Sequence, residues 1–290
     1  MTEPDPTAVA RFYDELAADY HLVYADWDAG MARQGEALDK LIRAKPGHGG
    51  PARVLDCSCG IGTQAIALAL RGHRVTGTDI SRSAAARAAR EAAARGVRLS
   101  AATADMRRLP FADARFDTVV CADNSLPHLL TEADVHAALA EMRRVLRPGG
   151  LLVVSTRPYD EILRARPTST APQTSSAPTG RTVTFQLWNW HDDGERYDLE
   201  HFQLLPIGGG SGGEPASGLG DKNEHGNENG RGDDHEGHDG WRVRVRRSTY
   251  WALTRRQLTD LATGAGFDAP KWHTPDSTGF FQPILTARAP

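Results

Sequence analysis

The amino-acid sequence predicts an α/β protein in which a doubly wound parallel sheet is preceded by a helical lid and interrupted by an antiparallel cap. Between residues 51 and 165, short hydrophobic segments with the character of strands alternate with helical segments, which is typical of a parallel sheet. Two amphipathic runs precede this alternation. After it, segments rich in aromatic and β-branched residues follow one another without helices between them, which favours antiparallel pairing.

Four parts are expected along the 290 residues. Residues 1–50 form the helical lid, 51–165 the ligand-binding core, 166–251 the inserted cap and 252–290 the C-terminal part of the core. Within the cap, residues 208–240 are dense in Gly, Asn, Asp, Glu and His and almost free of apolar side chains, so we expect a disordered loop. The loose spacing of its histidines favours a solvated linker over a metal site, and we expect no bound metal.

The lid sequence contains two helical patterns. Apolar residues recur at helical spacing over residues 8–16 and again over residues 31–42, until Pro46-Gly47 and Gly49-Gly50 end the second pattern. An aromatic stretch at residues 20–27 joins the two. The pattern therefore predicts two helices with aromatic side chains between them, ahead of the first core strand.

The core and cap elements follow from hydrophobic runs and from the residues that start or stop helices. The expected core strands are residues 53–56, 73–79, 97–101, 116–121 and 151–155. The helices expected between them are residues 63–71, residues 81–95, and a third that begins after Thr131-Glu132 and ends at Arg147-Pro148-Gly149-Gly150. Cap strands are expected at residues 183–190, 195–205 and 241–251. The chain then returns to the core in a helix capped by Thr254 and in a strand at residues 280–287.

Composition disfavours some functional classes. The formal net charge of −3 gives no overall basic field that would concentrate nucleic acid or an anionic membrane around the protein, so neither is expected as a partner. No segment reaches the roughly 18 consecutive apolar residues of a membrane span. The three cysteines form no evenly spaced framework, and residues 1–6 are acidic and proline-containing, unlike a secretory signal. These observations favour a reduced, cytoplasmic compartment.

The most informative motif stands where the first core strand ends. Val54-Leu55-Asp56 runs into Cys57-Ser58-Cys59-Gly60-Ile61-Gly62, and Asp79 ends the next strand. A glycine-containing turn after a strand lets the backbone approach a ligand. A carboxylate at the tip of the second strand can accept hydrogen bonds from both hydroxyls of a ribose. The combination predicts a bound adenosine nucleoside.

Polar residues also follow the third and fourth strands, as Asp105-Met106 and Asp123-Asn124. Because open parallel sheets bind ligands beyond the carboxyl ends of their strands, we expect these residues to share one site with the glycine turn. A nicotinamide dinucleotide is the competing ligand. Its pyrophosphate needs a third glycine close to the helix start, and Ala65 stands at that position, so the dinucleotide is disfavoured.

This succession of strand ends, from residue 53 to about residue 163, resembles the class I S-adenosylmethionine (SAM) methyltransferases, whose sheet is Rossmann-like. One departure is Ser58, which stands where the family usually has the first glycine of Asp/Glu-x-Gly-x-Gly-x-Gly. The resemblance implies S-adenosyl-L-methionine as cofactor and S-adenosyl-L-homocysteine as product. It nominates as cofactor-binding residues Asp56, Cys57, Gly60, Gly62, Asp79, Ile80, Asp105, Met106 and Ala122, with Tyr24 and Arg33 from the lid.

A narrower resemblance covers two segments on the acceptor side. Asn124-Ser125-Leu126-Pro127-His128-Leu129 is similar to the Asn-Ser-x-x-His-Leu segment of glycine N-methyltransferases, and Arg157-Pro158-Tyr159-Asp160-Glu161-Ile162-Leu163 to their Arg-Asn-Tyr-Asp-x-Ile-Leu segment. In that family the arginine holds the carboxylate of the amino acid and the asparagine lies beside the acceptor. The resemblance therefore nominates Arg157 and Asn124 as catalytic-site residues, since an arginine fork suits a carboxylate. Alternatively, Arg157 pairs with Asp160 or Asp123 and only braces its loop.

Two titratable residues complete the candidate site. Asp123 stands where the family usually has glycine, and its carboxylate could orient an amine or accept a proton, although it would repel a carboxylate substrate. His128 is a candidate base for a hydroxyl acceptor, or a support for its loop. Methyl transfer requires no covalent nucleophile, because its main demand is the alignment of a lone pair with the methyl group.

Aromatic residues are frequent in the lid and in the cap. Lid rings could close over the sulfonium charge and cap rings could receive an apolar or planar acceptor, with core packing as the alternative in both places. The residues concerned are Tyr13, Tyr20, Tyr24 and Trp27 in the lid, and Trp188, Trp190, Tyr197, Tyr250 and Trp251 in the cap.

We therefore expect a SAM-dependent methyltransferase that acts on a small-molecule acceptor, by N-methylation of an amine or nitrogen heterocycle. Glycine or sarcosine is one candidate acceptor. A small-molecule O-methyltransferase and a SAM-binding regulatory protein without turnover are the alternatives. Methylation of DNA adenine is disfavoured, because its Asn/Asp-Pro-Pro-aromatic motif is missing where Asp123-Asn124-Ser125-Leu126 stands. Assembly into a homo-oligomer is left open.

Overall fold

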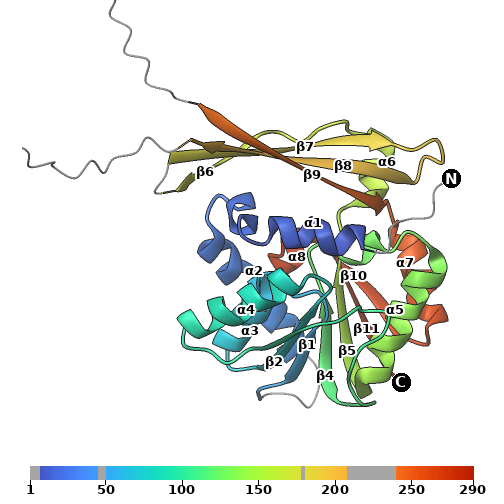
Figure 1. Ribbon diagram of the computed structural model, residues 1–290. Helices are drawn as coiled ribbons and strands as arrows, with labels where there is room; N and C mark the ends of the chain where they lie inside the picture. The colour runs from blue at the N-terminus through green and yellow to red at the C-terminus, as the bar shows by residue number, and fades with distance from the viewer. Residues whose placement is uncertain (1–6, 45–49, 178–179, 208–239) are drawn as a thin grey trace, which may run out of the picture.

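The computed structural model describes residues 7–44, 50–177, 180–207 and 240–290. A central sheet with flanking helices forms the core, and the cap sheet lies above it with the first lid helix between them (Figure 1). In the part of the chain that is described, no helix is long and apolar enough to cross a membrane.

Seven strands form the central sheet, in the order β10-β11-β5-β4-β1-β2-β3. Their bounds are β1 Arg53–Asp56, β2 Arg74–Asp79, β3 Ser100–Thr103, β4 Phe116–Cys121, β5 Leu146–Ser155, β10 Asp268–His273 and β11 Ile284–Arg288. Strands β1 to β5 pair in parallel, whereas β11 and β10 pair antiparallel at one edge. The order reverses between β1 and β4, so the carboxyl ends of these two strands flank the crevice in which such sheets bind ligands.

Helices cover both faces of this sheet. Their bounds are α2 Trp27–Arg43, α3 Thr63–Leu70, α4 Arg82–Ala94, α5 Glu132–Val145 and α7 Arg255–Gly264. Adjacent residues of β1 enter different cores: Val54 belongs to the cluster that contains residues of α2, α3 and α4, and Leu55 to the cluster that contains residues of α5 and α7. Burial on both faces explains why the parallel strands are continuous hydrophobic runs.

The cap is a four-stranded antiparallel sheet in the order β6-β7-β8-β9. Its strands are β6 Gln173–Ala177, β7 Gly180–Trp190, β8 Arg196–Pro206 and β9 Trp241–Trp251. The three predicted cap strands correspond to β7, β8 and β9. Alternate residues of β8 are buried, and Tyr197, Leu199 and His201 are among them. The cap therefore turns one face of its sheet towards the lid and the core.

The lid consists of α1 (Ala8–Leu16), the 3-10 helix η1 (Tyr20–Val23) and α2. The helix α2 begins before the predicted residue 31, because the side chain of Asp26 caps it by accepting a hydrogen bond from the backbone of Ala29 at 2.9 Å. Phe12 of α1 is buried. The helix α1 lies against β9, so the lid is held between core and cap.

Some elements differ from the prediction. Strand β3 begins at Ser100 and β5 at Leu146, so the Pro-Gly-Gly turn expected after α5 lies within β5. The prediction lacks the edge strands β6 and β10 and the helix α6 (Tyr159–Ala165). The loop expected at residues 208–240, with its histidines, lies outside the described residues except for Gly240.

Candidate active site

The turn between β1 and α3 is held tightly by its own backbone. Gly60 and Gly62 have φ values of +51° and +99°, which side chains other than glycine rarely adopt. The backbone N–H of Gly62 donates to the carbonyl of Cys59 at 2.7 Å, and a Cβ on Gly62 would stand 2.6 Å from Cδ1 of Ile66. The glycines therefore bring the turn and the start of α3 close together. Ser58, at the unusual position, does not interrupt the turn.

Asp79 stands at the tip of β2 and reaches this turn. One carboxylate oxygen accepts a hydrogen bond from the backbone N–H of Gly60 and the other from that of Ser81, both at 2.8 Å. Burial raises the pKa of Asp79 to about 6, so the group is ionised at neutral pH. Each oxygen has accepted one hydrogen bond and keeps capacity for another. Asp79 can thus receive two vicinal hydroxyls.

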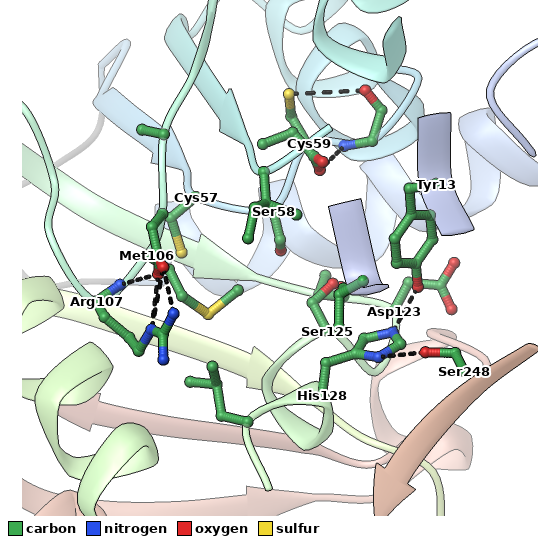
Figure 2. A pocket seen from close by; sticks show the side chains of 18 of the residues that line it. Tyr13, Cys57, Ser58, Cys59, Met106, Arg107, Asp123, Ser125, His128 and Ser248 are labelled. Atoms are coloured by element: carbon green, nitrogen blue, oxygen red, sulfur yellow. Dashed lines mark hydrogen bonds and ion pairs between the residues drawn. The ribbon is translucent and has the colours of Figure 1, made fainter. Parts of the chain in front are cut away.

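A cavity of about 270 Å³ opens above these residues, and we call it the donor cavity. Figure 2 shows Cys57, Met106 and Arg107 on one side of it and Tyr13, Asp123 and His128 on the other. Among the residues predicted to bind SAM, those that line the donor cavity are Cys57, Gly60, Asp79, Ile80, Asp105, Met106 and Ala122. The glycine turn, the carboxylate of Asp79 and the residues that follow β3 therefore surround the donor cavity, and these residues fit SAM.

The remaining nominated residues lie elsewhere. Asp56 is buried beneath the turn, where one oxygen accepts from the backbone of Ser58 at 3.3 Å and the other has no partner. Gly62 stands behind the turn at the start of α3. Tyr24 and Arg33 line a second cavity, so a role for them in SAM binding stays a prediction.

This second cavity, of about 560 Å³, lies between the lid, the cap and the ends of β4 and β5. We call it the acceptor cavity. Tyr13, Tyr20 and Asp123 line both cavities. The two spaces therefore meet at a wall made of two lid tyrosines and one carboxylate.

Asp123 and Asn124 follow β4 in the left-handed conformation, with φ values of +58° and +65°. Asp and Asn tolerate this conformation better than most residues. The backbone N–H of Asp123 donates to Oγ of Ser155 at 2.8 Å, which holds the loop to the end of β5. Oδ1 of Asn124 accepts from the backbone of Arg157 at 3.1 Å, while its buried Nδ2 has no partner. Asn124 therefore keeps an unused donor in the wall of the acceptor cavity.

Arg157 extends into the acceptor cavity from the end of β5. Its Nη1 donates to the hydroxyl of Tyr197 at 2.7 Å and its Nη2 to Oε1 of Gln186 at 3.2 Å. The guanidinium lies 4.9 Å from the ring centroid of Trp188 and 5.2 Å from that of Tyr250. Among the described residues it forms no ion pair. The alternative partner Asp160 is paired instead with Arg255 at 3.1 Å.

His128 ends the 3-10 helix η2 (Leu126–His128) and is held from three sides. Its Nε2 lies 2.8 Å from the hydroxyl of Tyr13, its Nδ1 lies 3.2 Å from Oγ of Ser248, and its ring lies 4.1 Å from that of Tyr250. Burial and the charge of Arg157 lower the pKa of His128 to about 3. A neutral ring with so low a pKa is a weak base, which favours a role in holding the Tyr13 hydroxyl.

Several contributors to the site have no motif in the sequence. Gln282, just before β11, donates to Asp123 at 3.4 Å and accepts from Ser155 at 2.9 Å. Gln186 and Tyr197 come from the cap and hold Arg157. The expected strand at residues 280–287 is the one signal that placed Gln282 near the sheet edge. The cap contacts depend on a fold that local patterns do not reveal.

Comparisons with known proteins agree with this geometry. A family model of the methyltransferase domain matches residues 54–150. The glycine/sarcosine N-methyltransferase of Parasynechococcus marenigrum is 37% identical over 139 residues, which cover 48% of each chain. The demethylmenaquinone methyltransferase of Beutenbergia cavernae is 38% identical over 162 residues, covering 54% of this chain and 62% of the relative. The chain thus spans about half the length of the first of these curated relatives.

A solved structure extends the likeness beyond the matched domain. SAM-bound CalS10, an amino pentose methyltransferase from Micromonospora echinaspora, superposes with a TM-score of 0.62 at 22% identity. The superposition covers 94% of this chain and 95% of that one, so the fold is shared over the lid, core and cap. The match of residues 54–150 to the methyltransferase domain, the curated relatives and the shared fold together support a class I SAM-dependent methyltransferase.

Proposed function

We propose that this protein transfers a methyl group from SAM to a nitrogen atom of a small molecule that also carries a carboxylate. The observation that carries the proposal is the position of Arg157. Its guanidinium lines the acceptor cavity next to the donor cavity and forms no ion pair among the described residues. A cation held only by neutral groups and aromatic rings is well suited to receive an anionic group of a ligand.

SAM supplies the activated methyl group, and the protein supplies alignment. Asp79 and the Gly60 turn hold the nucleoside, while Arg157 and Asn124 fix the acceptor from the opposite side. Tyr13 and Tyr20 lie at the wall between the two cavities and restrict the entry of water. Holding two reactants in an in-line arrangement provides much of the rate enhancement for a displacement of this kind.

The acceptor cavity has room for glycine and for larger acceptors. Its volume of about 560 Å³ and its wall of Trp188, Tyr250 and Phe281 leave room for an apolar or planar portion. An amine or a nitrogen heterocycle bearing a carboxylate satisfies both the aromatic wall and Arg157. The name of the glycine/sarcosine N-methyltransferase relative supports transfer to nitrogen.

Transfer to oxygen is the weaker proposal. A hydroxyl acceptor commonly needs a base, and His128, with a pKa near 3 and both ring nitrogens engaged, is poorly suited to that role. The carboxylate of Asp123 is a weak base for a hydroxyl, because a hydroxyl is far less acidic than an ammonium group. A regulatory protein that binds SAM without turnover is the remaining alternative. Any methyl transfer that depends on Asp79 would exclude it.

Calorimetric titration with SAM and S-adenosylhomocysteine tests the donor site first. Glycine, sarcosine and a panel of nitrogen heterocycles with and without a carboxylate are then titrated in the presence of S-adenosylhomocysteine. The Arg157→Gln variant should bind a carboxylate probe at least about tenfold more weakly, since it loses a charge-assisted pair, with unchanged S-adenosylhomocysteine affinity. Arg164→Gln, which changes an exposed side chain of α6, is the matched control. If Arg157→Gln lowers the affinities for the carboxylate probe and for S-adenosylhomocysteine equally, Arg157 does not have the proposed role of binding the acceptor carboxylate.

A further inference from the structure

The carboxylate of Asp123 is not needed to hold SAM or the group bound by Arg157, yet it stands between the two. We propose that Asp123 is a catalytic residue that receives the acceptor nitrogen as an ammonium group and takes its proton before methyl transfer. The acceptor is then a primary or secondary alkyl amine. This inference rests on the proposed function and narrows its substrate class.

Position is the first support. Asp123 lines the donor cavity and the acceptor cavity, and Tyr13 and Tyr20 are the other residues that line both. Its backbone is fixed by the hydrogen bond to Ser155 and by the left-handed conformation. An attacking nitrogen must cross the same wall to reach the methyl group. Asp123 is therefore the carboxylate placed to meet that nitrogen.

The partners of Asp123 are the second support. Its Oδ2 accepts hydrogen bonds from the hydroxyls of Tyr20 at 3.3 Å and Tyr24 at 3.1 Å, and its Oδ1 accepts from Gln282 at 3.4 Å. All three donors are neutral. In the described part of the chain, no lysine, arginine or histidine forms an ion pair with Asp123. A largely enclosed carboxylate without a cation is costly, and a cationic ligand would compensate its charge.

The surroundings favour proton transfer from an amine. The titratable and charged groups that face Asp123 from the lid, η2, the end of β5 and the cap are Tyr13, Tyr20, Tyr24, His128, Arg157 and Tyr250. Burial raises the pKa of Asp123, and the hydrogen bonds from Tyr24 and Tyr20 and the charge of Arg157 oppose that rise. A base with a raised pKa takes a proton from an ammonium group more readily than an ordinary aspartate does.

The atoms and charges balance without a further reactant. The ammonium gives one proton to the carboxylate, which becomes a neutral acid and leaves the nitrogen with a lone pair. That lone pair forms the nitrogen–carbon bond as the methyl–sulfur bond breaks, and the bonding electrons stay on sulfur. The products are S-adenosylhomocysteine and a methylated ammonium, and Asp123 later releases its proton to solvent. Many heterocyclic nitrogens are already neutral at pH 7 and need no such step.

A test that does not depend on the unknown acceptor uses sinefungin. In this analogue of S-adenosylhomocysteine, an amine-bearing carbon replaces sulfur, so an ammonium group stands where SAM carries its methyl group. The wild-type protein should bind sinefungin about tenfold or more tightly than S-adenosylhomocysteine, because of a charge-assisted contact with Asp123. The Asp123→Asn variant keeps the shape of the side chain and tolerates the left-handed backbone, but it has no charge. It should therefore abolish the preference for sinefungin over S-adenosylhomocysteine. Asp160→Asn, outside both cavities, should retain it.

Proton exchange is read in the same titrations. When sinefungin is titrated in buffers of different ionisation enthalpy, wild-type protein should release protons, and the release should grow as the pH is lowered towards the pKa of Asp123. The reason is that a bound cation stabilises the ionised form of Asp123, whose pKa is raised by burial. The Asp123→Asn variant should lack this release, and Asp160→Asn should show it.

The outcomes separate the two proposals. Binding of neither nucleoside by wild-type protein would overturn the proposed function and this inference with it. If wild-type protein binds both nucleosides but shows no preference for sinefungin over S-adenosylhomocysteine, this inference alone is overturned. A sinefungin preference that survives in Asp123→Asn would likewise remove Asp123 from the position assigned to it.

Discussion

At the scale of single residues, hydrogen-bond donors distinguish two buried carboxylates, Asp79 and Asp56. Asp79 has two backbone donors and spare acceptor capacity, whereas Asp56 has one donor at 3.3 Å and an oxygen without a partner. Burial raises the pKa of Asp56 to about 7. Because the pKa of Asp56 differs between the folded and the unfolded chain, the free energy of unfolding should depend on pH.

We predict a pH dependence that belongs to Asp56. An aspartate in an unfolded chain has a pKa of about 3.9, so between about pH 4 and pH 7 the folded protein binds a proton that the unfolded chain has lost. The contribution of Asp56 to the free energy of unfolding therefore falls as pH rises through this window, by roughly 2 to 4 kcal/mol. The Asp56→Asn variant should gain stability relative to wild type over the window in urea unfolding. A difference that stays constant from pH 4.5 to 7.5 would contradict the assignment.

Residue patterns predicted that the glycine turn and Asp79 lie together, and they gave no sign of the contacts around Asp123. Gly60 and Asp79 are 19 positions apart and lie at the ends of the adjacent strands β1 and β2, so the order of strands and turns along the chain places them together. The hydroxyl of Tyr24 reaches Asp123 across 99 positions of sequence, and Gln282 reaches it across 159. No local pattern encodes such pairs, because they arise only when lid, core and sheet edge pack together.

At the scale of elements, the starts of α4, α5 and α7 were predicted, whereas the edge strands β6 and β10 were missed. Ser81, Thr131 and Thr254 each cap a helix by accepting a backbone hydrogen bond, which is a local interaction with a local signal. The strand β10 contains Pro270, which cannot donate to a neighbour and so argues against a strand, but it lies at an edge where that donor is not required. The strand β6 is another edge, in a stretch dominated by small polar residues.

The capping box of α7 gives a test at this scale. The Thr254 side chain accepts from the backbone of Gln257 at 3.2 Å, and the Gln257 side chain accepts from the backbone of Thr254 at 2.9 Å. Thr254→Ala should lower the free energy of unfolding by about 1 kcal/mol in urea denaturation. Thr263→Ala, on an exposed turn of the same helix, should change it by less than about 0.5 kcal/mol. Equal effects of the two variants would show that the cap is not the stabilising feature.

At the scale of the whole molecule, lid and cap are joined to each other as well as to the core. Asp19, between α1 and η1, pairs with Arg244 and, at 3.3 Å, with Arg246 of β9. Arg246 also donates to the backbone carbonyl of Glu15 at 2.8 Å. These contacts join α1 and the residues that follow it to β9 of the cap. The core alone supplies the donor cavity floor, but its closure depends on segments from both ends of the chain.

We predict that breaking this junction loosens ligand binding without removing it. Asp19→Asn should make S-adenosylhomocysteine dissociate about three- to tenfold faster in stopped-flow displacement, because a partly buried pair of charges holds the lid down. Asp28→Asn, which breaks an exposed lid pair with Arg95 at 2.7 Å, should leave the rate nearly unchanged. Identical rates for Asp19→Asn and wild type would mean that the lid opens independently of the cap.

The left-handed backbone at Asp123 has a consequence for how this chain diverged from its relatives. A φ of +58° admits glycine, asparagine and aspartate and disfavours most other residues. Glycine, the residue usual at this position in the family, and aspartate have codons that differ by a single nucleotide. Under the proposed role of Asp123, a point mutation can therefore add or remove the amine-binding carboxylate while the backbone stays in place, so a lineage could exchange acceptors without passing through an unfolded intermediate sequence.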